Sequence, residues 1–212
     1  MAGTSVTLCG LARNEGPYLL EWIAWYKLLG IERIVIYDHD SQDQSMQILP
    51  ALHRAGEILH RPWPEREGVS PQIPAYRDAI AECPTEWIAF LDIDELLVLH
   101  RHQRLADLLA TMPEDCSAVV FNQRFFGSSG LLFQDDRLVI ERFIRTAPPD
   151  HPLNIWTKTI TRTRRIKEIV NPHGCVLSSG YFAAPDGRPL DMLDCSRSTE
   201  ISLGVAQYNH YM

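Results

Sequence analysis

Apolar runs and amphipathic segments alternate between residues 5 and 91 of the chain. Short runs rich in β-branched residues predict buried strands, whereas apolar residues three or four positions apart predict helices. The expected strands are 5–11, 31–37, 57–63 and 87–91, and the expected helices are 17–29, 43–54 and 75–82. This alternation predicts an α/β fold: a single Rossmann-like domain over residues 1–212, with a mostly parallel central sheet flanked by helices.

The pattern is less regular after residue 100. A short helix is expected at 104–111, and further strands are expected at 118–126, 138–144 and 156–162. Residues 180–200 contain several glycines and prolines, which predict a surface loop. The second half therefore predicts strands without the regular helical connections of the first half.

Three of the expected strands end in polar clusters, at residues 13–15, 38–40 and 92–95. The carboxyl ends of parallel strands lie along one edge of a sheet, where ligands bind in folds of this kind. We therefore expect the three clusters to converge on a single site.

Asp92 and Asp94 directly follow the strongly apolar strand at 87–91. Residues two positions apart in an extended chain face the same side, so both carboxylates are expected to point together, with Ile93 in the core. Two close carboxylates repel unless a cation lies between them, and a hard divalent ion prefers oxygen ligands. Such acids also cap helices or end strands, but the two neighbouring polar strand ends favour a metal site. Glu95 is expected to begin the next helix or to orient a neighbour.

Composition narrows the classes of partner and compartment. The formal net charge of −7 argues against a nucleic-acid partner, since such proteins usually present a basic face. The five cysteines form no Cys-x-x-Cys pair, which favours a reducing, cytoplasmic location. No apolar run approaches the ~20 residues of a transmembrane segment, and no signal peptide is expected. Peripheral association with a membrane is left open.

Residues 161–167 form the only basic cluster of the sequence. One interpretation is a solvated turn or strand edge, and the other is a local site for an anionic substrate. The sequence leaves both open.

Four segments resemble glycosyltransferases with the so-called A fold. Residues 87–97 resemble the Asp-x-Asp segment of these enzymes. Residues 11–22 and 31–38 resemble their opening segments, and residues 209–211 resemble a short motif near their end. The combination is similar to families 2 and 92 and spans most of the chain.

This resemblance implies an enzyme that transfers a sugar from a nucleotide-diphosphate sugar, usually a UDP-sugar, to a carbohydrate or glycoconjugate acceptor. It further implies a Mn²⁺ or Mg²⁺ cofactor and inversion at the anomeric carbon. Residues 1–100 would form the nucleotide-sugar-binding half, and residues 101–212 the acceptor-side half. Related enzymes continue beyond the segment that matches 209–211, which leaves open a truncated chain or an acceptor side completed by a partner.

The resemblance also implies roles for individual residues. Asp92 and Asp94 become the catalytic candidates: Asp94 as direct metal ligand, and Asp92 facing the ribose or the metal's water shell. His210 and His173 are the candidate nitrogen ligands of the metal, and His210 is alternatively a contact of the diphosphate. The residues expected to contact the donor, apart from Asp92, are Arg13, Asn14, Glu15, Asp38 and Arg77.

Several of these residues have ordinary alternatives. Asn14 could cap the following helix, residues 38–41 could form a turn, and Arg77 could pair with Asp78 or Glu82. An inverting transfer also needs a general base on the acceptor side. Its candidates, which the sequence does not rank, are Asp135, Asp136, Glu141 and Asp150.

Three other classes of protein remain in competition. Phosphotransferases with an aspartyl nucleophile also use Asp-x-Asp, but on their first strand. Nucleotidyltransferases would carry a glycine-rich basic loop after that strand, where this chain has a single glycine. A non-catalytic sugar-binding module could stack sugars on Trp63, Trp87 or Trp156, although core packing is the commoner role of tryptophan.

Overall fold

Nine strands form the central sheet of the computed structural model, which describes residues 4–131 and 136–211. Their order is β3-β2-β1-β4-β7-β6-β13-β5, and β10 pairs with β6 outside this path. The strands are β1 (Val6–Ala12), β2 (Arg33–Asp38), β3 (Leu59–Pro62), β4 (Trp87–Phe90), β5 (Glu95–Leu99), β6 (Cys116–Phe126), β7 (Thr157–Arg162), β10 (Tyr181–Ala183) and β13 (Ala206–Tyr211).

Most strand pairs in this sheet are parallel. Strands β3, β2, β1 and β4 run parallel to one another, and both β10 and β13 run parallel to β6. Strand β7 is antiparallel to β4 and β6, and β5 is antiparallel to β13. The expected α/β class and mostly parallel sheet are confirmed.

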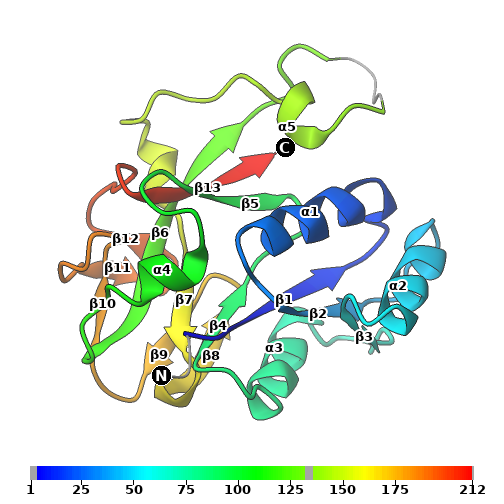
Figure 1. The fold of residues 1–212 in the computed structure, drawn as a ribbon, viewed down its shortest axis with the longest axis horizontal. Coiled ribbons are helices and arrows are strands. Elements are labelled where there is room, and N and C mark those ends of the chain that lie inside the picture. The colour runs from blue at the N-terminus through cyan, green and yellow to red at the C-terminus, as the bar shows by residue number, and fades with distance from the viewer. Residues whose placement is uncertain (1–3, 132–135, 212) are drawn as a thin grey trace.

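Helices cover both faces of the sheet, because alternate residues of its strands are apolar on both sides (Figure 1). Ile34 and Ile36 pack with α1 (Gly16–Leu28), α2 (Ser45–Arg54) and α4 (Leu105–Leu109). Val35 and Tyr37 face α3 (Gln72–Ala81) and the antiparallel hairpin of β8 (Ile166–Asn171) and β9 (Gly174–Leu177). Within the described residues, no helix is both long and apolar enough to cross a bilayer.

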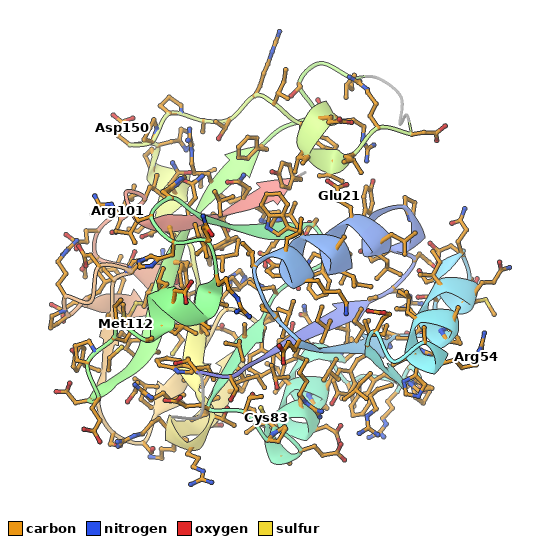
Figure 2. The ribbon with its side chains drawn as sticks, viewed as in Figure 1. Glu21, Arg54, Cys83, Arg101, Met112 and Asp150 are labelled. Carbon is orange, nitrogen blue, oxygen red and sulfur yellow. The ribbon has the colours of Figure 1, made fainter. Side chains whose placement is uncertain are left out.

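Two expectations for the second half are wrong. The strand expected at 138–144 is instead a short helix, α5 (Val139–Arg142), because the Glu21 carboxylate accepts the N–H groups of Val139 and Ile140 at its start. Figure 2 shows Glu21 between α1 and α5. The loop expected at 180–200 contains β10 and a small antiparallel pair, β11 (Met192–Asp194) and β12 (Arg197–Ser198).

The basic cluster spans the end of β7, the short 3-10 helix Thr163–Arg165 and the start of β8. The Arg162 guanidinium pairs with Glu86 and lies 4.3 Å from the centroid of the Trp87 ring. Arg165 donates to the Ser179 hydroxyl. These contacts favour the strand-edge interpretation of the cluster.

Candidate active site

The three polar clusters meet at one edge of the sheet, as the parallel strands require. Ala12 at the end of β1 stands in register with Asp38 at the end of β2. On the other side of β1, the Leu91 N–H donates to the Cys9 carbonyl at 3.1 Å. The segment that follows β4 therefore begins beside β1, and the predicted convergence is confirmed.

The Asp92–Asp94 segment is a turn rather than the extended chain that was expected. The Glu95 N–H donates to the Asp92 carbonyl at 3.1 Å, which closes the turn. Glu95 then begins β5 instead of a helix, and its side chain is fully buried. Ile93 is buried, as expected, but the two aspartates take different partners.

Helix α1 holds this turn with two aromatic side chains. The Trp22 indole donates to the Asp92 carbonyl at 2.9 Å. The Tyr26 hydroxyl donates to the Glu95 carbonyl at 2.9 Å and accepts the Leu97 N–H at 3.0 Å. Gly10 gives the indole room, since a Cβ there would lie 3.1 Å from Trp22. The backbone positions of both aspartates thus depend on α1.

Replacing Tyr26 with phenylalanine is expected to lower the free energy of unfolding by about 1–3 kcal/mol, because a buried carbonyl and N–H lose their partner. Urea denaturation would measure this loss. Tyr18→Phe is the matched control, since the Tyr18 hydroxyl makes no hydrogen bond within the described residues. Equal losses in the two variants would contradict this role of Tyr26.

Asp92 is bound by two side chains from other elements. Its Oδ2 accepts from Lys158 Nζ at 2.8 Å, and its Oδ1 accepts from Gln72 Nε2 at 3.2 Å. Burial alone would raise the pKa of Asp92, but the charge and hydrogen bond of Lys158 outweigh it and hold that pKa below its ordinary value. Asp92 is therefore ionised and largely neutralised by Lys158.

Asp94 pairs with His210, which β13 brings into the site. His210 Nε2 lies 3.1 Å from Asp94 Oδ2, and the Tyr211 N–H donates to the Asp94 carbonyl at 3.0 Å. The imidazole stacks on Phe125, with ring centroids 5.4 Å apart. Burial lowers the pKa of His210, but the hydrogen bond and charge of Asp94 outweigh it, so this pKa lies above its ordinary value.

Negative charge accumulates at this edge. Burial, followed by the charges of Asp94, Asp43 and Asp92, raises the pKa of Glu15 to about 7. Glu15 precedes α1 and is partly exposed. A carboxyl group that resists ionisation beside two aspartates marks a position where a cation would be stabilised.

Asn14 and Asp38, which are expected to contact the nucleotide sugar, join the loop after β1 to the loop after β2. The Asn14 N–H donates to the Ser41 hydroxyl at 3.1 Å, and its side-chain oxygen accepts the Gln42 N–H at 2.7 Å. Asn14 has φ of 61° and does not cap α1. Asp38 accepts the Ser41 N–H at 3.1 Å, which is the turn interaction proposed for it.

Two arginine candidates make surface ion pairs. Arg13 lies 3.2 Å from Glu65, and both side chains are exposed. Arg77 lies 3.8 Å from Glu168 on β8, rather than pairing with Asp78 or Glu82. Arg13 lies on the same loop as Asn14 and Glu15. Within the described residues, Arg77 makes no contact with Asp92.

His173 lies in the turn between β8 and β9. Its Nδ1 is 3.2 Å from the Thr157 carbonyl, so the ring donates there and leaves Nε2 as an acceptor. Burial, followed by the charge of Lys158, lowers the pKa of His173. The neutral imidazole is the form that can bind a metal.

The candidates for the general base lie near α5. The Glu141 carboxylate accepts the Leu138 N–H at 3.2 Å and so caps that helix. Asp136 and Asp150 are exposed, and Asp135 lies outside the described residues. These positions do not distinguish a base.

The carboxylate and imidazole groups of the site suit a divalent ion that is also bound by phosphate groups of a ligand. Across residues 4–131 and 136–211, no three His, Cys, Asp or Glu side chains are grouped as a metal cluster. Mg²⁺ sites often use only one or two protein carboxylates together with substrate phosphates and water. The Asp94 carboxylate, 41% exposed and next to His210, fits such a site.

The sequence did not indicate Lys158 or Gln72, which bind Asp92. The one available signal was a lysine in the middle of a β-prone run, Thr157–Ile160, where a buried charge needs a partner. The partner of Gln72 was not visible in any local pattern.

The fold and the site place this protein among the α/β proteins that bind ligands at the carboxyl ends of their strands, where its charged side chains gather. The sequence matches glycosyltransferase family 92 over residues 3–184. The chain therefore belongs to this family. Its membership favours the glycosyltransferase interpretation over the phosphotransferase, nucleotidyltransferase and sugar-binding alternatives.

The chain is also similar to individual proteins of known sequence or structure. A family 92 protein of Ricinus communis is 29% identical over 133 residues, which cover 58% of this chain and 23% of that protein. The S. aureus TarS 1-349 structure is 19% identical, has a TM-score of 0.46 and covers 76% of this chain and 47% of that one. A Pyrobaculum calidifontis mannosyltransferase, solved with GDP-Man and Mn²⁺, is 20% identical with a TM-score of 0.42, covering 58% of this chain and 38% of that chain.

Proposed function

We propose that this protein transfers a sugar from a nucleotide-diphosphate sugar, with UDP as the preferred nucleotide, to an acceptor hydroxyl in a metal-dependent, inverting reaction. Family membership supports the reaction class. The proposed sites for the metal and the nucleotide sugar rest on one observation. This is the Asp94–His210 pair at the carboxyl edge of the sheet, where the pKa of Glu15 is raised to about 7.

The donor would lie across the ends of β1, β2 and β4, within residues 1–100. In this arrangement Arg13, Asn14 and Glu15 border the nucleotide, and Asp38 meets the base or ribose. Asp38 already has a partner in His60, whose Nε2 lies 3.4 Å from Oδ2. Arg77 would have to leave Glu168 to reach a phosphate.

The departing diphosphate gathers negative charge as its bond to the sugar breaks. A bound Mn²⁺ or Mg²⁺ would supply Lewis-acid stabilisation of that charge. The chain's own residues bind and orient: Asp94 and His210 would hold the ion, with His173 as a further candidate ligand. Trp22 and Tyr26 keep the turn that carries both aspartates in place.

A carbohydrate or glycoconjugate acceptor would approach from residues 101–212. A small cleft beside Asp94 joins the two halves of the chain, since it is lined by Tyr18, Trp22 and Ile93 from one half and by Val139 and Tyr211 from the other. We propose the base of the inverting reaction among Asp135, Asp136, Glu141 and Asp150.

Calorimetric titration of UDP, GDP and CMP, each with and without Mn²⁺, tests this function. UDP is expected to bind most tightly, and only with the metal, because the ion must join Asp94 to the diphosphate. At 100 times its dissociation constant, UDP with Mn²⁺ should stabilise the fold by about 2.7 kcal/mol. Nucleotide affinity that is the same with and without Mn²⁺ would reject the metal-dependent donor site.

A further inference from the structure

Asp92 and Asp94 are two residues apart but are held in different ways. Both carboxylate oxygens of Asp92 accept from protein donors, Lys158 on one side and Gln72 on the other. In the described part of the chain, Asp94 accepts a side-chain contact only from His210, at 3.1 Å. Asp94 is therefore the carboxylate open to a new ligand, whereas Asp92 is already bound on two sides.

Lys158 is the buried cation of the site. It lies on β7, and its side chain is 2% exposed. Its Nζ lies 2.8 Å from Asp92 Oδ2 and 3.2 Å from Oε2 of the fully buried Glu95. Burial lowers the pKa of Lys158, but Glu95 and Asp92 outweigh it, so this pKa lies above its ordinary value. The ammonium group is itself closed to solvent, whereas its partner Asp92 is 32% exposed and can meet a substrate.

Glu95 holds both parts of this arrangement. Its Oε2 accepts the Asp92 backbone N–H at 3.0 Å and also lies against the Lys158 ammonium. Glu95 thus fixes the backbone of the turn, while Lys158 fixes the direction of the Asp92 side chain. The two contacts together leave Asp92 little freedom to turn toward Asp94.

We propose that Lys158 is a positioning residue that keeps Asp92 out of the metal's coordination sphere and directs its carboxylate to hydroxyl groups of the sugar nucleotide. The inference rests on the proposed function, since it presupposes a cation at Asp94. With Lys158 in place, the metal has one protein carboxylate and depends on the phosphates of the donor for further ligands.

The double variant Lys158→Met/Glu95→Gln tests this role. It removes one positive and one negative charge, so the net charge of the cluster is unchanged and the fully buried Glu95 charge is removed together with its cation. Mn²⁺ alone, titrated by electron paramagnetic resonance, is expected to bind about tenfold more tightly because Asp92 is released as a second carboxylate ligand. The kcat for transfer is expected to fall as Asp92 leaves the donor. If Lys158 had only a structural role, its replacement would change the free energy of unfolding without increasing the affinity for Mn²⁺.

Two single variants keep the test decisive if the double variant does not fold. Asp92→Asn should leave the affinity for Mn²⁺ within about twofold of the original chain, because Asp92 is not a ligand there, while kcat/KM falls. Glu95→Gln keeps Lys158 on Asp92 and should not tighten Mn²⁺ binding.

A folded double variant with unchanged or weaker Mn²⁺ affinity would overturn the proposal. So would a loss of about tenfold or more in Mn²⁺ affinity for Asp92→Asn, the scale expected for removing a carboxylate ligand. If the original chain fails to bind Mn²⁺ with UDP, the proposed function itself fails, and the inference fails with it. If the original chain binds Mn²⁺ with UDP but the double variant leaves Mn²⁺ affinity unshifted, only the role of Lys158 is lost.

Discussion

Replacing Asp94 with asparagine is expected to lower kcat/KM for sugar transfer by about 100- to 1,000-fold, the scale of losing one preorganised electrostatic contact to a transition state. Asparagine keeps the shape of the side chain but removes the charge that would hold the metal beside His210. Steady-state release of UDP, measured over a range of Mn²⁺ concentrations, gives this ratio. The fold should be little affected, because the Asp94 side chain is 41% exposed.

Asp107→Asn is the matched control for this variant. Asp107 is an exposed aspartate on α4, away from the polar edge of the sheet, and its replacement should leave kcat/KM unchanged. If Asp94→Asn keeps more than about a tenth of the original kcat/KM, the direct metal ligand lies elsewhere.

The single variant Lys158→Met is expected to lower the free energy of unfolding by about 3–5 kcal/mol, because it leaves the buried Glu95 carboxylate and the partly exposed Asp92 carboxylate without their cation. The loss should depend on pH. Burial, partly offset by Lys158, raises the pKa of Glu95 to about 7, and removal of the lysine would raise it further. A carboxyl group whose pKa is raised by folding costs no stability below its unfolded value and progressively more as pH rises toward the folded value.

Urea denaturation of both chains at about pH 5 and about pH 8 should therefore show the larger difference at the higher pH. Adding Glu95→Gln to Lys158→Met should recover most of the lost stability, since the main unpaired charge is removed. A difference that is equal at both pH values, or that Glu95→Gln does not reduce, would contradict this account of the buried pair.

The first half of the fold could be predicted from the sequence because its interactions are local. Each strand through β4 is followed or preceded by a helix whose apolar face repeats with helical period, and this pattern alone dictates a parallel sheet. The position of Asp92 after a buried strand followed from the same pattern. The convergence with Asp38 needed only the rule for parallel strands.

The rest depends on partners that are distant in sequence. Residues 138–144 have the apolar composition of a strand, yet the carboxylate of Glu21, more than a hundred residues earlier, starts a helix there. Lys158 meets Asp92 across a separation of 66 residues, through the antiparallel register of β7 against β4. No local pattern specifies either contact. The sequence therefore predicts the acidic residues of the site but not Lys158.

The place of β13 in the sheet has a consequence for synthesis on the ribosome. This strand lies between β6 and β5, although it follows them by some eighty residues or more. A nascent chain that has emerged only through β6 holds two strands whose shared neighbour has not yet been made. Open strand edges of this kind can pair with other chains until their neighbour is in place. The emergence of β13 closes this gap and delivers His210 to Asp94 in one event, so the candidate metal site forms only when the sheet is complete.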